Sequence, residues 1–134
     1  MRDTSRMRYL GLDYGKKRIG VAVSDGDGSI AFPRKTISND ANILRELAHV
    51  IEEERIEEIV IGDTRSLSGA ENLITAESDS FAAKLESSVH MPIHRMREAW
   101  SSAEAMRFAP PGKRHDDSSA AAIILQRFLD SRPK

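Results

Sequence analysis

Three carboxylate residues are spaced so that a folded chain could bring them together: Asp13, Glu98 and Asp117. Asp13 lies where an apolar run of strand character gives way to a glycine-containing turn, and Glu98 follows a second strand-like segment. Clustered carboxylates repel one another, and hard cations such as Mg²⁺ or Mn²⁺ relieve that repulsion. Two such ions about 4 Å apart can activate a water molecule and stabilise the leaving oxygen of a phosphodiester. The three acids therefore predict a metal-dependent nuclease site.

Basic residues accompany each acid, although the net charge of the whole chain is −1, from 20 basic and 21 acidic residues. A protein that coats nucleic acid without specificity would be strongly basic. Lysine and arginine side chains bind phosphates and so position a nucleic acid. We therefore expect a local phosphate-binding patch that comprises Lys16, Lys17, Arg18, Arg95, Arg97, Lys113 and Arg114.

The order of predicted elements indicates how these residues are positioned. Strands are expected over residues 9–15, 19–24, 29–37, 57–62 and 91–96, from their apolar patterning and turn signals. Pro33 favours an edge position for the third strand. Helices are expected after Ser38-Asn39-Asp40, along the stripe of Ile74, Phe81 and Leu85, after the capping box at Ser101, and from His115 to about Ser131.

A hairpin followed by alternating helices and strands predicts a mixed α/β sheet with helices on both faces. Right-handed crossovers make the first, fourth and fifth strands parallel, and the expected strand order is 3-2-1-4-5. Ligands of such sheets bind beyond the carboxyl ends of the parallel strands, so Asp13 and Glu98 should share one edge. Asp63 follows the fourth strand at the same edge and is a candidate fourth metal ligand.

The last helix supplies the third acid. Asp117, Ala121, Ile124 and Phe128 fall on one stripe, which must be the apolar face that packs on the sheet. Asp116 lies about 100° away around the helix axis. Because a charged group on a packing face is costly unless it is paired or binds metal, we expect Asp117 to meet the other two acids.

Length and composition exclude several classes of protein. A chain of 134 residues with 40% hydrophobic and 31% charged residues fits one globular domain, expected over residues 7–134 after a disordered tail at residues 1–6. It has no cysteine, which excludes disulfides and thiolate-bound metals and is compatible with a cytoplasmic location. No apolar run approaches the roughly 18 residues of a membrane span, so no membrane partner is expected.

Three segments resemble the YqgF (RuvX) family of Holliday-junction-resolvase-like proteins, also called pre-16S ribosomal RNA nucleases. They run from Leu10 to Asp25, from Glu98 to Ala105 and from Asp117 to Leu125. The resemblance implies an RNase H-like fold and metal-dependent phosphodiester hydrolysis, with the acids of the family on Asp13, Glu98 and Asp117. It also implies a role in trimming the 5′ end of the small-subunit ribosomal RNA precursor.

The chain departs from the pattern of the family at two places. Members often have Asp-Glu-Arg at the second motif, whereas this chain has Arg97-Glu98-Ala99. Where Gly-Leu-Pro commonly ends the fourth strand, this chain has Gly62-Asp63-Thr64. Other RNase H-like nucleases often carry an acid there, which makes Asp63 a substitute ligand. The departures concern how the substrate is held more than the metal site.

Each acid also has a purely structural interpretation. Asp13 could cap its turn, Glu98 could be a solvated loop residue, and Asp117 could stabilise the helix dipole. An Asp-x-Gly turn also forms the phosphate loop of sugar kinases and actin-like ATPases, but those folds need two such domains.

Four functions stay open from the sequence. The first is an endonuclease on structured RNA, acting in 5′ maturation of pre-16S rRNA. The alternatives are a Holliday junction resolvase on branched DNA, a non-catalytic nucleic-acid-binding module, and an assembly factor that acts through protein contacts. The chain could act as a monomer or a homodimer.

Overall fold

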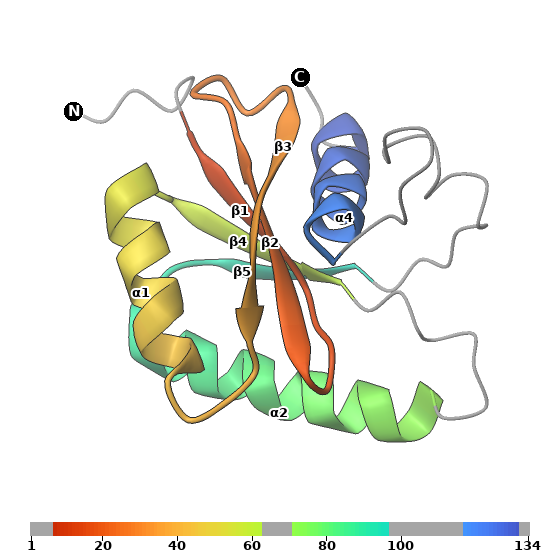
Figure 1. Ribbon diagram of the computed structural model, residues 1–134. Coiled ribbons are helices and arrows are strands. Elements are labelled where there is room, and N and C mark those ends of the chain that lie inside the picture. The colour runs from red at the N-terminus through yellow and green to blue at the C-terminus, as the bar shows by residue number, and fades with distance from the viewer. Residues whose placement is uncertain (1–6, 63–70, 97–116, 132–134) are drawn as a thin grey trace.

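Five strands form one sheet in the order β3-β2-β1-β4-β5 (Figure 1). The computed structural model describes residues 7–62, 71–96 and 117–131. The strands are β1 (Tyr9–Asp13), β2 (Arg18–Ser24), β3 (Ala31–Ser38), β4 (Glu58–Gly62) and β5 (Ile93–Met96). This arrangement confirms the predicted strand order.

The pairing directions of the strands also confirm the prediction. β1 and β3 both run antiparallel to β2, whereas β4 runs parallel to β1 and to β5. Pro33 lies in the edge strand β3, the position in a sheet where proline is tolerated. The register between β2 and β3 shifts after Val21, opposite this proline.

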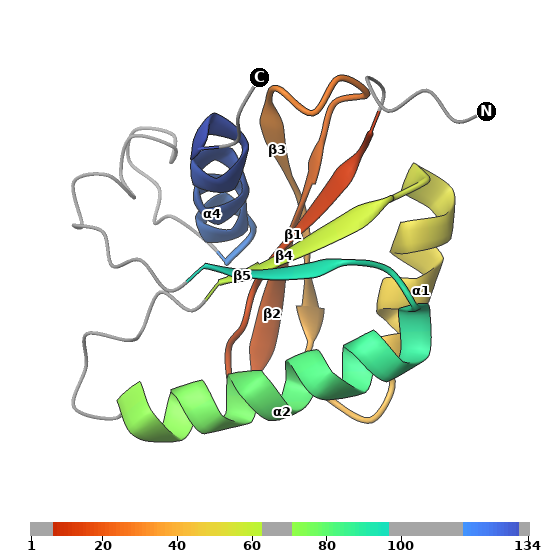
Figure 2. The ribbon, with the colours of Figure 1, turned by 180° about the vertical axis from the view of Figure 1, so that it is seen from behind.

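Helices cover both faces of the sheet, as expected (Figures 1 and 2). α1 (Ile43–Glu54) and α2 (Glu71–Val89) lie on one face, and α4 (Asp117–Ser131) lies on the other. The helix expected after Ser101 lies outside the described residues, as does the predicted start of the last helix at His115.

α1 begins later than its start signal predicts. The Asp40 carboxylate accepts a hydrogen bond from the Asn42 N–H group (2.9 Å), and the Ile43 N–H group donates to the Asp40 carbonyl (3.1 Å). These bonds form a turn that precedes the helix, so the N-cap is Asn42 rather than one of residues 38–40. The side chain of Asn39 is thereby available for a different role.

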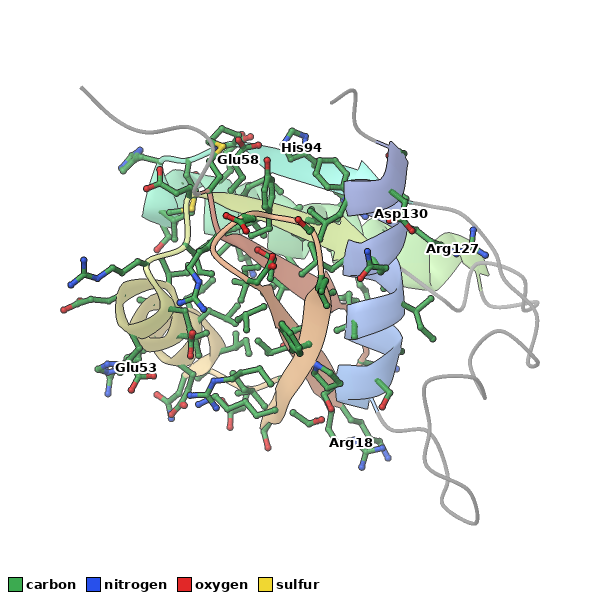
Figure 3. All side chains as sticks on the ribbon, turned by 90° about the horizontal axis from the view of Figure 1, so that it is seen from above. Arg18, Glu53, Glu58, His94, Arg127 and Asp130 are labelled. Carbon is green, nitrogen blue, oxygen red and sulfur yellow. The ribbon has the colours of Figure 1, made fainter. Side chains whose placement is uncertain are left out.

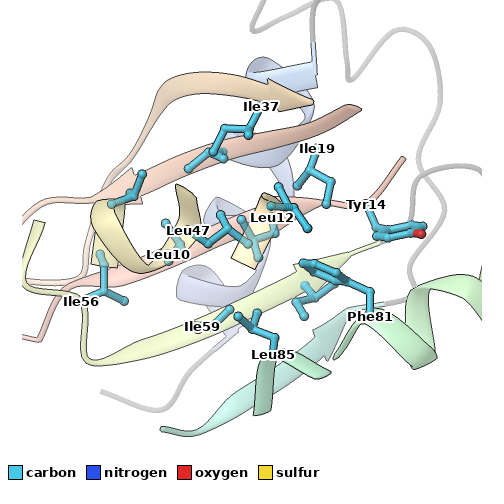
Figure 4. Close-up of a cluster of buried hydrophobic side chains, with 14 of the residues drawn as sticks. Leu10, Leu12, Tyr14, Ile19, Ile37, Leu47, Ile56, Ile59, Phe81 and Leu85 are labelled. Atoms are coloured by element: carbon cyan, nitrogen blue, oxygen red, sulfur yellow. The ribbon is translucent and has the colours of Figure 1, made fainter. Parts of the chain in front are cut away.

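Successive side chains of β1 point to opposite faces of the sheet and so contribute to two separate hydrophobic clusters. Leu10, Leu12 and Tyr14 join the larger cluster beneath α1 and α2 (Figure 4). Tyr9 belongs to the smaller cluster beneath α4. Because successive side chains of a strand point to opposite faces, Asp13 shares the α4 face with Tyr9.

No helix within residues 7–62, 71–96 and 117–131 is long and apolar enough to cross a membrane.

Candidate active site at the carboxyl edge of the sheet

Asp13 is the last residue of β1, and it is buried, with 6% of its surface exposed. It lies opposite Gly62 in the parallel pair of β1 and β4, and Gly62 lies opposite Met96 in β5. Since neighbouring strands are about 4.8 Å apart, the ends of β1 and β5 are separated by about 10 Å. Three parallel strands therefore end together at one edge of the sheet.

Two glycines let α4 lie directly on this part of the sheet. A Cβ atom built on Gly11 would lie 2.7 Å from Leu125 Cβ and 3.1 Å from the Ala121 carbonyl oxygen. A Cβ atom built on Gly62 would lie 2.6 Å from Ile124 Cδ1. Carbon atoms in contact are normally about 3.5–4.0 Å apart. A Cβ atom at Gly11 would therefore press on the helix itself, and one at Gly62 would displace the side chain of Ile124.

The direction of α4 brings its first turn to the end of β1. Near the start of the strand, Phe128 packs on Tyr9, with ring centroids 5.8 Å apart. Two residues further along, the backbone of Ala121 faces Gly11. A further step of about 6.6 Å along β1 reaches Asp13. From Ala121, a similar step of about 6 Å back along α4 reaches the start of the helix.

Asp117 is the first residue of α4, so its backbone begins the helix at the edge where β1 ends. Ala121 and Ile124 are almost fully buried in the cluster beneath the helix, and Phe128 packs against that cluster. This confirms the predicted packing face of the helix. The side chain of Asp117 lies outside the described part of the structure.

A second set of contacts holds the far end of α4. His94 Nε2 and Glu58 Oε1 are 2.6 Å apart, which links β5 to β4 (Figure 3). The His94 ring packs on Phe128, with centroids 4.7 Å apart. Gln126 bonds the start of β3, because its Oε1 accepts a hydrogen bond from the Ala31 N–H group (2.9 Å). The helix is therefore fixed along its length.

The predicted basic residues Lys16, Lys17 and Arg18 lie at the turn between β1 and β2, and all three are exposed. The turn follows Asp13 directly. Figure 3 shows Arg18 at the end of the molecule toward which the start of α4 points. The structure thus brings these three cations to the carboxyl edge of β1.

Asn39 fixes the backbone of this turn, a role that its place in the sequence does not reveal. Its side-chain Nδ2 group donates to the carbonyls of Gly15 (2.8 Å) and Lys16 (3.3 Å). Its backbone N–H group donates to the Lys17 carbonyl (2.9 Å). Asn39 therefore holds three consecutive carbonyls, although it lies at least 22 residues after them in the sequence.

Arg95 does not join the phosphate-binding patch. Its guanidinium donates to Asp79 Oδ1 (2.7 Å) and to Ser78 Oγ (2.7 Å), both in α2. Its position in β5 points it to the α2 face, away from the side of the sheet that carries Asp13 and α4. Arg95 therefore anchors α2 to the edge strand, and the prediction that it binds phosphate is wrong.

Several predicted site residues lie outside the described residues. They are Asp63, Arg97, Glu98, Lys113 and Arg114. Within residues 7–62, 71–96 and 117–131, no three acidic or histidine side chains form a group that could hold a metal ion. In the predicted ligand set, the structure therefore describes the side chain of Asp13 alone.

Comparisons with known proteins give one consistent family. The family profile described as "RuvX: Holliday junction resolvase" matches residues 7–131. A protein of Maridesulfovibrio salexigens named "Putative pre-16S rRNA nuclease" is 39% identical, over 92% of this chain and 98% of its own length. A protein of the same name from Oleidesulfovibrio alaskensis is 41% identical, over 92% of each chain.

A solved structure shares the fold. It is titled "T. thermophilus RuvC in complex with Holliday junction substrate", and it superposes with a TM-score of 0.60 at 12% identity. The likeness covers 92% of this chain and 93% of that one. The mixed sheet with its order β3-β2-β1-β4-β5 is therefore an RNase H-like fold.

Proposed function

Because this chain belongs to the RuvX family of nucleases, we propose that it is a divalent-metal-dependent endonuclease that matures the 5′ end of pre-16S rRNA. One observation carries the proposal: the buried Asp13 ends β1 where the first turn of α4 lies over the sheet. Phosphodiester hydrolysis is the reaction class of the family. The RNA substrate is inferred from the names of its relatives. Processing of ribosomal RNA would make the cytoplasm its location.

The proposed metal ligands are Asp13, Glu98 and Asp117, with Asp63 as an additional one. Asp13 and the start of α4 share one edge of the sheet. Glu98 follows Met96 by two residues, so the chain can carry it no farther than about 7 Å from the end of β5. Carboxylate oxygens from adjoining strand ends are the donors that Mg²⁺ and Mn²⁺ prefer. Bound there, such ions would activate water and stabilise charge on the departing oxygen.

The other residues of the proposed site hold the substrate. Lys16, Lys17 and Arg18 are exposed on a turn whose backbone is fixed, so they can bind phosphates on either side of the bond to be cut. Arg97, Lys113 and Arg114 are proposed to extend this patch. Because Asn39 fixes the turn beforehand, less ordering is required when RNA binds.

A second candidate substrate is branched DNA, favoured by the description of the family profile. Resolution of a four-way junction needs two symmetric cuts, so it requires a dimer with two active sites. Cleavage of an RNA leader needs only one. The oligomeric state under cleaving conditions therefore bears on the choice of substrate.

The test compares three labelled substrates: an RNA that carries the 5′ leader of pre-16S rRNA, a four-way DNA junction and a linear DNA duplex. Each is incubated with the purified chain in Mg²⁺, in Mn²⁺ or in EDTA. We expect the RNA alone to be shortened, and only with metal present. If the chain cleaves the junction but not the RNA, the proposal that its substrate is RNA is wrong and a resolvase of branched DNA takes its place. RNA binding in EDTA with no cleavage in either metal would contradict the nuclease itself.

A further inference from the structure

A pocket of about 380 Å³ opens on the other side of the sheet, between α2 and the start of α1. Its size falls within the roughly 300–1,000 Å³ of ordinary ligand sites. Its walls combine aromatic, polar and charged side chains. They include Tyr14, Asn39, Leu44, Glu77, Phe81 and Lys84.

The carboxylate of Glu77 gives the pocket its chemical character. Its Oε2 atom is buried, and no group among the described residues donates a hydrogen bond to it. A buried acceptor without a donor is unfavourable, so a ligand that supplies donors here is stabilised. Because χ3 of glutamate is a broad torsion, rotation about it can turn this oxygen from its buried position toward donors in the pocket.

The aromatic part of the pocket lies beside this carboxylate. Tyr14 and Phe81 are in contact (Figure 4), with ring centroids 5.3 Å apart. Both also line the pocket. Each residue is 7% exposed, so only a small part of each ring is open to a ligand in the pocket. Lys84 lies two helical turns after Glu77 on the same face of α2, and it is exposed, as a group that meets a phosphate would be.

We propose that this pocket binds a guanine base of the RNA substrate. A carboxylate accepts two hydrogen bonds side by side. Guanine is the standard base whose Watson–Crick edge carries two adjacent donors, N1–H and N2–H₂, whereas adenine, cytosine and uracil have no two adjacent donors there. Glu77 therefore selects guanine, the small exposed parts of Tyr14 and Phe81 contact its ring, and Lys84 binds a phosphate at the rim.

The pocket and the proposed active site are adjacent in the chain. Tyr14 follows Asp13 directly, so the two Cα atoms are about 3.8 Å apart while their side chains lie on opposite faces of the sheet. Asn39 both lines the pocket and holds the turn with Lys16. A guanine in the pocket would thus fix the position of neighbouring phosphates at Asp13. This inference rests on the proposed function and adds a sequence preference to it.

The test measures binding of five-nucleotide RNAs that differ only in the central base, by fluorescence anisotropy in EDTA. Wild type is expected to bind UUGUU about 100-fold more tightly than UUAUU, the effect of two charge-assisted hydrogen bonds. Inosine lacks the N2 amine and should weaken binding about 10-fold relative to guanine. Because no metal is present, the result is independent of cleavage.

Matched variants test whether Glu77 and the pocket cause the preference for guanine. Glu77→Gln places an amide N–H₂ group against the guanine donors and should abolish the preference, whereas Glu86→Gln, at an exposed position of the same helix, should keep it. Ala41→Trp should block the pocket at its exposed rim without changing Glu77, which covers the case of a Glu77 variant that unfolds. Equal binding of guanine and adenine by wild type, or an unchanged preference in folded Glu77→Gln or Ala41→Trp protein, would overturn the proposal.

Discussion

Replacing Gly11 with alanine should push α4 away from the sheet and misalign the active site. The added Cβ atom would lie 2.7 Å from Leu125 Cβ, and an ordinary contact needs about 3.6 Å, so the helix must move by about 1 Å. Trimming Leu125 to alanine cannot fully relieve the clash, because alanine keeps its Cβ and the Ala121 carbonyl is also only 3.1 Å away.

The expected magnitude follows from this displacement. Overpacking of a close-packed core costs about 2 kcal/mol, which for a domain of this size lowers Tm by about 7 °C. The displaced helix carries Asp117 at its start. A misplacement of about 1 Å at a catalytic group lowers the rate about 100-fold. Cleavage should therefore fall far more than stability does.

The assay combines thermal unfolding by circular dichroism with the cleavage rate at a temperature well below both midpoints. Gly26→Ala is the matched control, because a Cβ atom built there meets nothing within 4 Å. It should change stability by less than about 0.5 kcal/mol and leave cleavage unchanged. If Gly11→Ala behaves like Gly26→Ala in both measurements, the argument that this glycine seats the helix is refuted.

Two further predictions concern the basic turn. Asn39→Ala should lower the free energy of unfolding by about 1–2 kcal/mol and raise the KM for RNA several-fold, because two carbonyls lose their donor. Asn42→Ala should do neither, since the Asn42 side chain makes no capping bond. Changing Lys16 and Lys17 to alanine should reduce the slope of log K against log [salt] by about 2 in filter binding. An unchanged slope would remove the turn from the phosphate-binding patch.

The sequence predicts the features that depend on local periodicity. An apolar run that leads into a glycine-containing turn predicts that Asp13 lies at or near the end of a strand, and helical spacing predicts that Ala121 and Ile124 face the sheet, as they do. General rules of strand connection limit the possible strand orders and need no side-chain detail.

Features that depend on distant pairs of residues could not be predicted in this way. Asn39 looks like part of a helix start, because nothing local shows that its amide reaches the carbonyl of Gly15, 24 residues earlier. Arg95 looks like a phosphate ligand until its pairing with Asp79 is seen. The contact of Gly11 with α4 likewise joins residues more than 100 positions apart.

The most direct test of the central claim is the cleavage rate of Asp13→Asn in Mg²⁺, measured beside wild type and Asp27→Asn, an exposed control. The amide keeps the size of the side chain but loses the charge that would bind metal. The account predicts a loss of about 1,000-fold, or about 4 kcal/mol of transition-state stabilisation, in Asp13→Asn protein that stays folded. Asp27→Asn should cleave like wild type. Cleavage at the wild-type rate by folded Asp13→Asn protein would contradict the assignment of the site.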